Sequence, residues 1–439
     1  MKYEKFFELA KEAGIEESQL YISRSYSLSF SLFHSEVDKY STSTSLRIFA
    51  RGIVKGKVGT ASCDVWDLNK AKYLVEEIVR NAKIIENDDP AFIFEGSPKY
   101  KKISTFNKEL ATISIDEKMA KLHEIEQAIR NYDSRIVEVQ TVQYSESENA
   151  LTIMNSKGLK LVQKSNYFAY VGVALASENG QVKSGYDVFL DNDFHKFDVQ
   201  KLASSIGKIT VEQLGGEPCL TGKYRIVLSP DAVSSLIGAY ISNADAESIQ
   251  KNASLFVGKL NTKVASRKVT IEDKPLLRSI FARWFDDEGV ATYNKPIIKN
   301  GVLQTYLYNL TTAAKDGVNS TGNASLGAKM SVTPFYLTMK PGKKTQEELF
   351  NEVGNGVYIT DLSGLNAGLN PQSGNFSLQS TGFLIENGKR GRPLDLITVS
   401  GNLLTLFNDI STVGSDVKCF GDGVSCPSVI VKKLSITGK

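Results

Sequence analysis

The stretch LYISRSYSLSFSL, residues 20–32, alternates apolar and polar side chains. Leu20, Ile22, Leu28 and Phe30 hold even positions, while serines fill the odd positions from 23 to 31. Because successive side chains of a strand point to opposite faces, this period of two predicts a half-buried strand or hairpin.

The segments around this stretch repeat one order of elements. Residues 2–13 have helical spacing, residues 45–63 continue as strands around turns at Gly52 and Gly56, and helical spacing returns from Ala71 to Ala82. A helix with apolar positions 119–129, strands over 134–190 with an Asn179-Gly180 hairpin turn, and a helix capped by Asp198 follow. Residues 1–213 are therefore expected to form two similar helix–strands–helix halves in one layered system.

Glycine and proline at 215–222 interrupt both the helical spacing and the strand alternation, which places a domain boundary there. We expect an N-terminal α/β-layered domain over 1–215 and a C-terminal β-rich domain over 216–439, an α+β class overall. The second domain should begin with strand 224–228 and a helix from about 230 to 250. Turns at Asn300-Gly301, Asn355-Gly356 and Asn387-Gly388, with a capping box from Thr345 to Glu348, suggest a barrel or sandwich.

Composition narrows the function classes. The formal charge is only +3, from 52 basic and 49 acidic residues, so no nucleic-acid footprint is evident. An uninterrupted apolar segment of signal or membrane-spanning type is missing, which favours a cytoplasmic protein without a membrane partner. The four cysteines suit buried thiols better than a disulfide scaffold.

Several motifs of the second domain occur in a fixed order: DDEGV at 286–290, IIKNGVL at 297–303, STGN at 320–323, SGNF from 373 and ISTVGSD at 410–416. Together they resemble the TldD/PmbA family, and the PmbA/TldE-like branch in particular. The resemblance implies a cytosolic two-subunit metallopeptidase acting on peptides, with zinc on one subunit; older family names mention modulation of DNA gyrase.

In the zinc-bearing subunit of that family, a helix carries H-E-x-x-x-H. Two imidazoles hold Zn²⁺ and the glutamate acts as general base. Ungapped alignment places this motif on residues 238–243, so the ligand positions are Gly238 and Asn243 and the base position is Ala239. Glycine and alanine have no donor atom, and no histidine follows His195, so we expect no catalytic residues and no zinc on this chain.

Other candidates are weaker. Asp286, Asp287 and Glu288 form an acidic cluster that either binds a cation or accepts backbone hydrogen bonds. With Asn323, Ser373 and Gly374 they are the expected substrate-binding residues. The resemblance also implies a C-terminal zinc ligand in the catalytic branch, for which Cys426 is the best single candidate. Residues 426–431 resemble the terminal strand of PmbA-type chains more closely, so a structural role of Cys426 is the expectation.

These observations leave several hypotheses open. The first is a non-catalytic partner subunit that pairs with a TldD-like, zinc-bearing homologue and helps to enclose a peptide. The second is a stand-alone, homo-oligomeric peptide-binding or regulatory protein. The hypothesis of a gyrase modulator rests on the family's older name, and the nearly balanced charge argues against direct DNA binding. A displaced peptidase site, built from the acidic cluster and Cys426, is the last.

Overall fold

The computed structural model describes residues 3–86 and 89–439 of the chain. The first domain contains α1 (Glu4–Glu12), β1 (Glu17–Phe33), β2 (Glu36–Val54), β3 (Lys57–Cys63), α2 (Leu68–Ala82), η1 (Lys108–Thr112), α3 (Ile115–Arg130), β4 (Ile136–Asn155), β5 (Lys160–Glu178), β6 (Gln181–Asp191), η2 (Phe194–Lys196) and α4 (Val199–Val211). The predicted order of helix, strands, helix therefore occurs twice.

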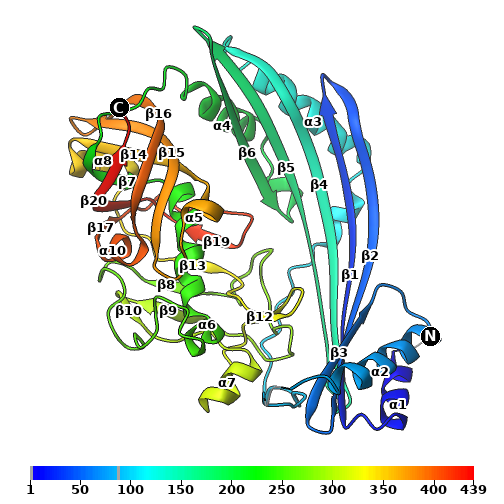
Figure 1. Ribbon diagram of the computed structural model, residues 1–439. Helices are drawn as coiled ribbons and strands as arrows, with labels where there is room; N and C mark the ends of the chain where they lie inside the picture. Colours follow the sequence, from blue (N-terminus) through cyan, green and yellow to red (C-terminus); the bar gives the residue numbers. More distant parts are fainter. Residues whose placement is uncertain (1–2, 87–88) are drawn as a thin grey trace.

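The six strands form one curled antiparallel sheet in the order β3-β2-β1-β4-β5-β6 (Figure 1). The first strands of the two halves, β1 and β4, meet in the centre, so the halves are related across that junction. Leu20 and Ile22 pack with α1 and α2, whereas Leu28 and Phe30 pack with α3 and α4. The alternation in β1 is thus explained by helix pairs covering one face, while the serines point to the other.

The expected turn at Gly52 is wrong. Gly52 lies inside β2, where an added Cβ would come within 2.7 Å of Ile15 and 3.0 Å of Ile78. The glycine is needed for close packing, and the chain turns instead at Lys55 and Gly56, both with positive φ.

The second domain contains β7 (Gly222–Leu228), α5 (Pro230–Ile241), η3 (Ser242–Ala244), α6 (Ala246–Gln250), β8 (Ile271–Asp273), β9 (Lys295–Lys299), β10 (Val302–Leu303), α7 (Leu310–Asp316), β11 (Ala324–Leu326), β12 (Met330–Val332), β13 (Leu337–Met339), α8 (Gln346–Val353), β14 (Gly356–Ser363), α9 (Leu365–Gly368), β15 (Asn375–Glu386), β16 (Lys389–Asn402), α10 (Leu403–Asn408), β17 (Ile410–Val413), β18 (Lys418–Cys419), β19 (Val424–Cys426) and β20 (Val429–Thr437). Strands β16, β15, β14, β7 and β20 pair in sequence, and β16 also pairs with β20. This closes a barrel, which resolves the barrel-or-sandwich expectation.

Two further expectations need correction. The helix predicted over 230–250 breaks after Ile241, because η3 intervenes and Asp245 caps the short α6 with its side chain. Asn355-Gly356 is not a hairpin turn: it links α8 to β14, which runs parallel to β7. The capping box at Thr345 and the turns at 300–301 and 387–388 are confirmed.

The two domains touch at both ends of the large sheet. At one end, Arg390 donates to both carboxylate oxygens of Glu212. At the other, Gln163 of β5 donates to the carbonyl of Ala282 and accepts from the backbone N–H of Trp284. None of the described helices is long and apolar enough to cross a membrane.

Candidate functional site

Helix α5 carries the positions where the family resemblance places the zinc motif. Ser229 caps it by accepting from the N–H of Ala232, and Pro230 occupies the first turn, so the sequence starts a helix directly after β7. Its buried side packs Leu236, Ile237 and Tyr240 into the core of the second domain. The helix lies on the side of that domain turned toward the large sheet (Figure 1).

The first two motif positions have different surroundings. Gly238 is exposed, and no atom lies within 4 Å of where its Cβ would be. Ala239 is half-buried and packs against the core of the second domain. A larger side chain therefore has clear room at Gly238, and neither position presents a polar side-chain atom.

Asn243, the last motif position, has a different environment. It is 4% exposed, and its Nδ2 donates to the carbonyls of Ala239 at 3.1 Å and Tyr240 at 3.4 Å. Its Oδ1 accepts from the N–H of Leu255 at 2.9 Å and from the hydroxyl of Ser254 at 3.4 Å. The amide therefore terminates α5 and fixes the chain that returns toward it.

Zinc is the metal that the resemblance implies, and these residues do not fit it. Gly238 and Ala239 offer no ligand atom, and both atoms of the Asn243 amide are engaged with the protein. Across residues 3–86 and 89–439, no group of three or more His, Cys, Asp or Glu side chains is arranged to hold a metal ion.

The acidic turn at 286–288 is buried and fully hydrogen-bonded. Asp286 accepts from the N–H groups of Glu288, Val290 and Ala324 at 2.9–3.0 Å. Asp287 accepts from Arg283 and from the N–H of Leu326, at 2.5 and 2.7 Å. Both oxygens of each carboxylate are thus occupied by donors of the protein.

Glu288 joins the two domains. Its Oε1 is 3.2 Å from the guanidinium of Arg51 on β2, and its Oε2 accepts from the N–H of Leu310, the first residue of α7, at 2.7 Å. Burial, together with the neighbouring charge of Glu288, raises the pKa of Asp286 to about 8, although three N–H donors oppose this shift. The geometry is that of a structural turn: its charges hold α7 and the second domain against β2.

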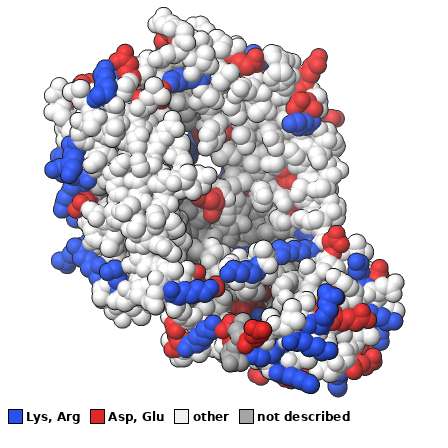
Figure 2. All heavy atoms as spheres, in the orientation of Figure 1, with Lys and Arg blue, Asp and Glu red and all other residues white. Residues whose placement is uncertain are grey.

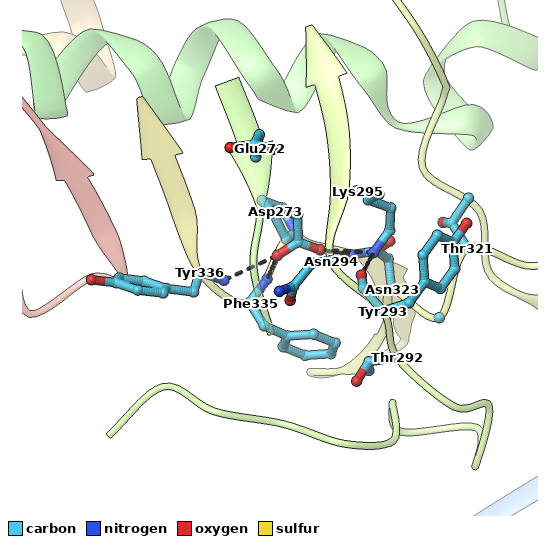
Figure 3. A network of polar contacts seen from close by, with 12 residues as sticks. Glu272, Asp273, Thr292, Tyr293, Asn294, Lys295, Thr321, Asn323, Phe335 and Tyr336 are labelled. Carbon is cyan, nitrogen blue, oxygen red and sulfur yellow. Dashed lines mark hydrogen bonds and ion pairs between the residues drawn. The ribbon is translucent and has the colours of Figure 1, made fainter. Parts of the chain in front are cut away.

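A second buried network surrounds Asp273 (Figure 3). One oxygen of Asp273 accepts from the N–H groups of Phe335 and Tyr336, both at 3.1 Å. The other accepts from Lys295 Nζ at 3.0 Å and from Asn323 Nδ2 at 2.8 Å. Burial lowers the pKa of Lys295, against the opposing charge of Asp273. Asn323 thus belongs to a buried ion-pair network at 0% exposure, and its Oδ1 has no partner among the described residues.

The loop before β15, which contains Ser373 and Gly374, approaches the end of α5. An added Cβ on Gly374 would lie 2.8 Å from Leu255, the residue whose N–H bonds to Asn243. Ser373 donates its N–H to Asn370 and accepts from Asn402 through its carbonyl. The structure therefore brings residues 373–374 and Asn243 together through Leu255.

Cys426 lies at the opposite end of the same helix. It is buried, and its Sγ donates to the carbonyl of Pro230 at 3.2 Å. Gly238 is eight residues further along α5, a rise of about 12 Å at 1.5 Å per residue. Burial also raises the pKa of the Cys426 thiol, so it is held in the protonated form.

A hollow separates the two domains, and Figure 2 shows that its visible walls carry few charged side chains. The sheet contributes serines of β1 and β2, such as Ser25 and Ser45, whose hydroxyls are 2.7 Å apart. A cavity of about 740 Å³ lies between β6 and the second domain, where it is lined by Leu190, Asp191 and Phe281 among others.

The fold and this site define an α+β protein in which a curled antiparallel sheet faces a closed barrel across a hollow. Three domain families match in order: PmbA/TldA metallopeptidase domain 1 over residues 19–82, the central domain over 108–214 and the C-terminal domain over 221–438. A Thermotoga maritima crystal structure, whose name refers to modulation of a DNA gyrase, is 31% identical, with 99% of both chains covered and a TM-score of 0.92.

A Buchnera aphidicola protein named as a metalloprotease PmbA homologue is 24% identical over 96% of this chain and 93% of its own. TldE from Thermococcus kodakarensis shares the fold, with a TM-score of 0.91 at 22% identity over 99% of both chains. The chain belongs to the PmbA/TldD family of metallopeptidases.

Sequence reasoning missed the Asp273–Lys295 pair and the contact between Arg51 and Glu288. Lys295 begins an apolar strand, KPIIK, and a lysine beside buried isoleucines is a weak sign of a buried partner. Arg51 gives no comparable signal, because its partner lies far away in the sequence.

Proposed function

We propose that this chain is the zinc-free partner subunit of a cytosolic peptidase of the PmbA/TldD family. One observation carries the proposal: the family's zinc motif falls on Gly238, Ala239 and Asn243, which supply no free ligand atom. In this role the chain pairs with a TldD-like homologue that holds zinc, and contributes binding surface rather than chemistry to a peptide substrate.

The substrate-binding surface in this proposal is the part of the second domain around the open face of α5. Gly238 leaves space there, Ala239 is a small side chain beside it, and the loop at Ser373 and Gly374 packs beside the end of the helix. Small side chains and exposed backbone let an extended peptide approach closely. The carboxylates of Asp286, Asp287 and Glu288 and the amide nitrogen of Asn323 bond to the protein itself, so in this proposal these four residues support the surface rather than contact the peptide.

A free edge of the sheet supports pairing with a second chain. Strand β3 covers β2 only from Ile48 to Val54, and every residue from Glu36 to Ser45 is exposed. Residues 41–45 of this part are all serine or threonine, whereas 36–40, near the hairpin tip, include three charged residues beside exposed Val37 and Tyr40. An uncovered, uncharged edge such as 41–45 tends to pair with another chain unless it is protected.

The test is to purify this chain alone and after co-expression with a TldD-like homologue from the same source. Zinc content and cleavage of unstructured peptides are measured for both preparations. The chain alone should contain no stoichiometric zinc and cleave nothing, while the mixture should give an active complex with zinc. Stoichiometric zinc and activity in the isolated chain would refute the proposal.

The edge of β2 is tested by the double variant Thr42→Lys/Thr44→Lys, because lysines on an edge strand oppose pairing. It should prevent assembly with the homologue. The control, Thr437→Lys at an exposed position on β20, should assemble normally. Self-association through β2 with no binding to the homologue would instead favour the stand-alone homo-oligomer.

A further inference from the structure

Strand β5 has an edge that its own sheet leaves uncovered. β5 runs from Lys160 to Glu178, but β6 pairs with it only from Phe168 onward. Figure 1 shows β5 continuing past the end of β6. Within the described chain, residues 160–167 have a strand neighbour on the β4 side alone.

The hydrogen-bond pattern identifies which backbone groups face that edge. The N–H of Asn155 donates to the carbonyl of Leu159 at 3.1 Å, which makes these opposite residues a hydrogen-bonded pair. Such pairs alternate along antiparallel strands, so Leu161 and Gln163 also bond to β4. Lys160, Val162 and Lys164 therefore direct their N–H and C=O groups to the open edge, and none of these groups has a backbone partner there in the described residues.

A groove runs along this edge. The segment before η1 is tied to the sheet at two points: Asn155 donates to the carbonyl of Phe94 at 2.6 Å, and Asn107 and Asn166 exchange bonds of 2.8 and 2.7 Å. Between these points the segment follows the second domain, and Tyr100 donates to the carbonyl of Gly289. The space left beside β5 has a volume of about 710 Å³.

The walls of the groove are basic. Lys102, Lys108, Lys160 and Lys164 line it, and none of its lining residues is acidic. Among the described residues, Lys160 is the one of these four lysines with a carboxylate within 4.0 Å, that of Glu4. The ammonium of Lys102 lies over the ring of Trp284 at 5.7 Å, so an aromatic surface lies beneath the positive charge.

We propose that this groove binds an extended acidic peptide that adds as a strand to the edge of β5. Lys160, Val162 and Lys164 supply main-chain hydrogen bonds, as in other strand-addition complexes. Since side chains alternate along a strand, carboxylates at every second peptide position face the lysines, and the residues between them face Ile103 and Trp284. At about 3.3 Å per residue, the open edge accommodates four to six peptide residues. The groove shares no lining residue with the surface around α5, so the inference goes beyond the proposed function and adds a second peptide site.

The experiment measures binding of a fluorescent (Glu-Val)4 peptide to the isolated, full-length chain by anisotropy. The peptides (Lys-Val)4 and (Glu-Pro)4 should bind at least tenfold more weakly, because one reverses the charge and the other removes alternate N–H donors. The double variant Lys102→Glu/Lys164→Glu should weaken binding of (Glu-Val)4 about tenfold, or about 1.4 kcal/mol. The control, Lys201→Glu at an exposed position of α4, should leave the affinity for (Glu-Val)4 unchanged.

Hydrogen exchange supplies a readout that needs no variant. The amides of Val162 and Lys164 should exchange more slowly when (Glu-Val)4 is bound. Equal affinity for the acidic and basic peptides, no binding, or unchanged exchange at these amides would overturn the inference. Because the isolated chain is used, such a result would leave the proposed pairing with a zinc-bearing homologue untouched.

Discussion

Gly238 and Asn243 are the first and last positions of the aligned zinc motif. The structure predicts opposite effects on stability when each is replaced by alanine. Asn243→Ala leaves the partly buried N–H of Leu255 without its acceptor, which costs about 1–3 kcal/mol. Losing the amide's donation to the carbonyls at the end of α5 adds about 1 kcal/mol. The free energy of unfolding of the second domain should therefore fall by about 2–4 kcal/mol.

Gly238→Ala should instead increase the free energy of unfolding. The position is exposed, helical and free of neighbours within 4 Å, so alanine enters without a clash. Alanine is favoured over glycine in a helix by about 1 kcal/mol. Differential scanning calorimetry should show a melting temperature lower by about 5–15 °C for Asn243→Ala, and a few degrees higher for Gly238→Ala. A neutral Asn243→Ala or a strongly destabilising Gly238→Ala would refute this reading of α5.

Three further predictions concern the scaffold. Lys295→Ala leaves Asp273 buried without its cation, so the free energy of unfolding measured in urea should fall by about 3–5 kcal/mol. The control, Lys299→Ala at an exposed site, should change it by less than about 0.5 kcal/mol. Gly59→Ala should destabilise the first domain by about 3 kcal/mol in the same assay, because its Cβ would fall on the backbone carbonyl of Ile78; a neutral result would exclude that close approach. In the native protein at pH 7.5, a thiol reagent should modify exposed Cys419 and spare Cys426, whose pKa burial raises; mass spectrometry of digested peptides tests this, and rapid modification of Cys426 would contradict its placement.

Local patterns predicted the first domain well. The alternation around Leu28, the Asn179-Gly180 turn and the Asp198 cap depend on neighbours in the sequence, and the structure contains each of them. The repeated order of helix, strands and helix then predicted two similar halves. Gly52 misled the prediction because glycine serves both turns and close packing, and the positions of Ile15 and Ile78 in the fold distinguish the two.

The second domain was harder to predict because its decisive contacts are distant in sequence. Closure of the barrel depends on pairing β16 with β20, and β7 pairs with β14 across more than a hundred residues. The sequence placed the candidate site after β7, and α5 begins there. It could not show that Asn243 ends the helix, since that role depends on Leu255 returning to bond with its amide.

The different environments of Gly238 and Asn243 bear on whether zinc binding could be restored. A triple variant, Gly238→His/Ala239→Glu/Asn243→His, writes the family motif back into the chain. The first side chain has room on the open face of α5, whereas the second replaces Ala239, which is half-buried against the core. The third replaces an amide that accepts from Leu255 while donating to Ala239, and an imidazole that accepts that N–H has no lone pair left for a metal. The triple variant should therefore fold less stably and take up no stoichiometric zinc in equilibrium dialysis, with Gly238→His alone as the stable control. Stoichiometric zinc in the triple variant would show that the end of α5 can rearrange, and that the loss of the ligands alone, rather than the architecture around Asn243, separates this chain from the zinc-bearing branch.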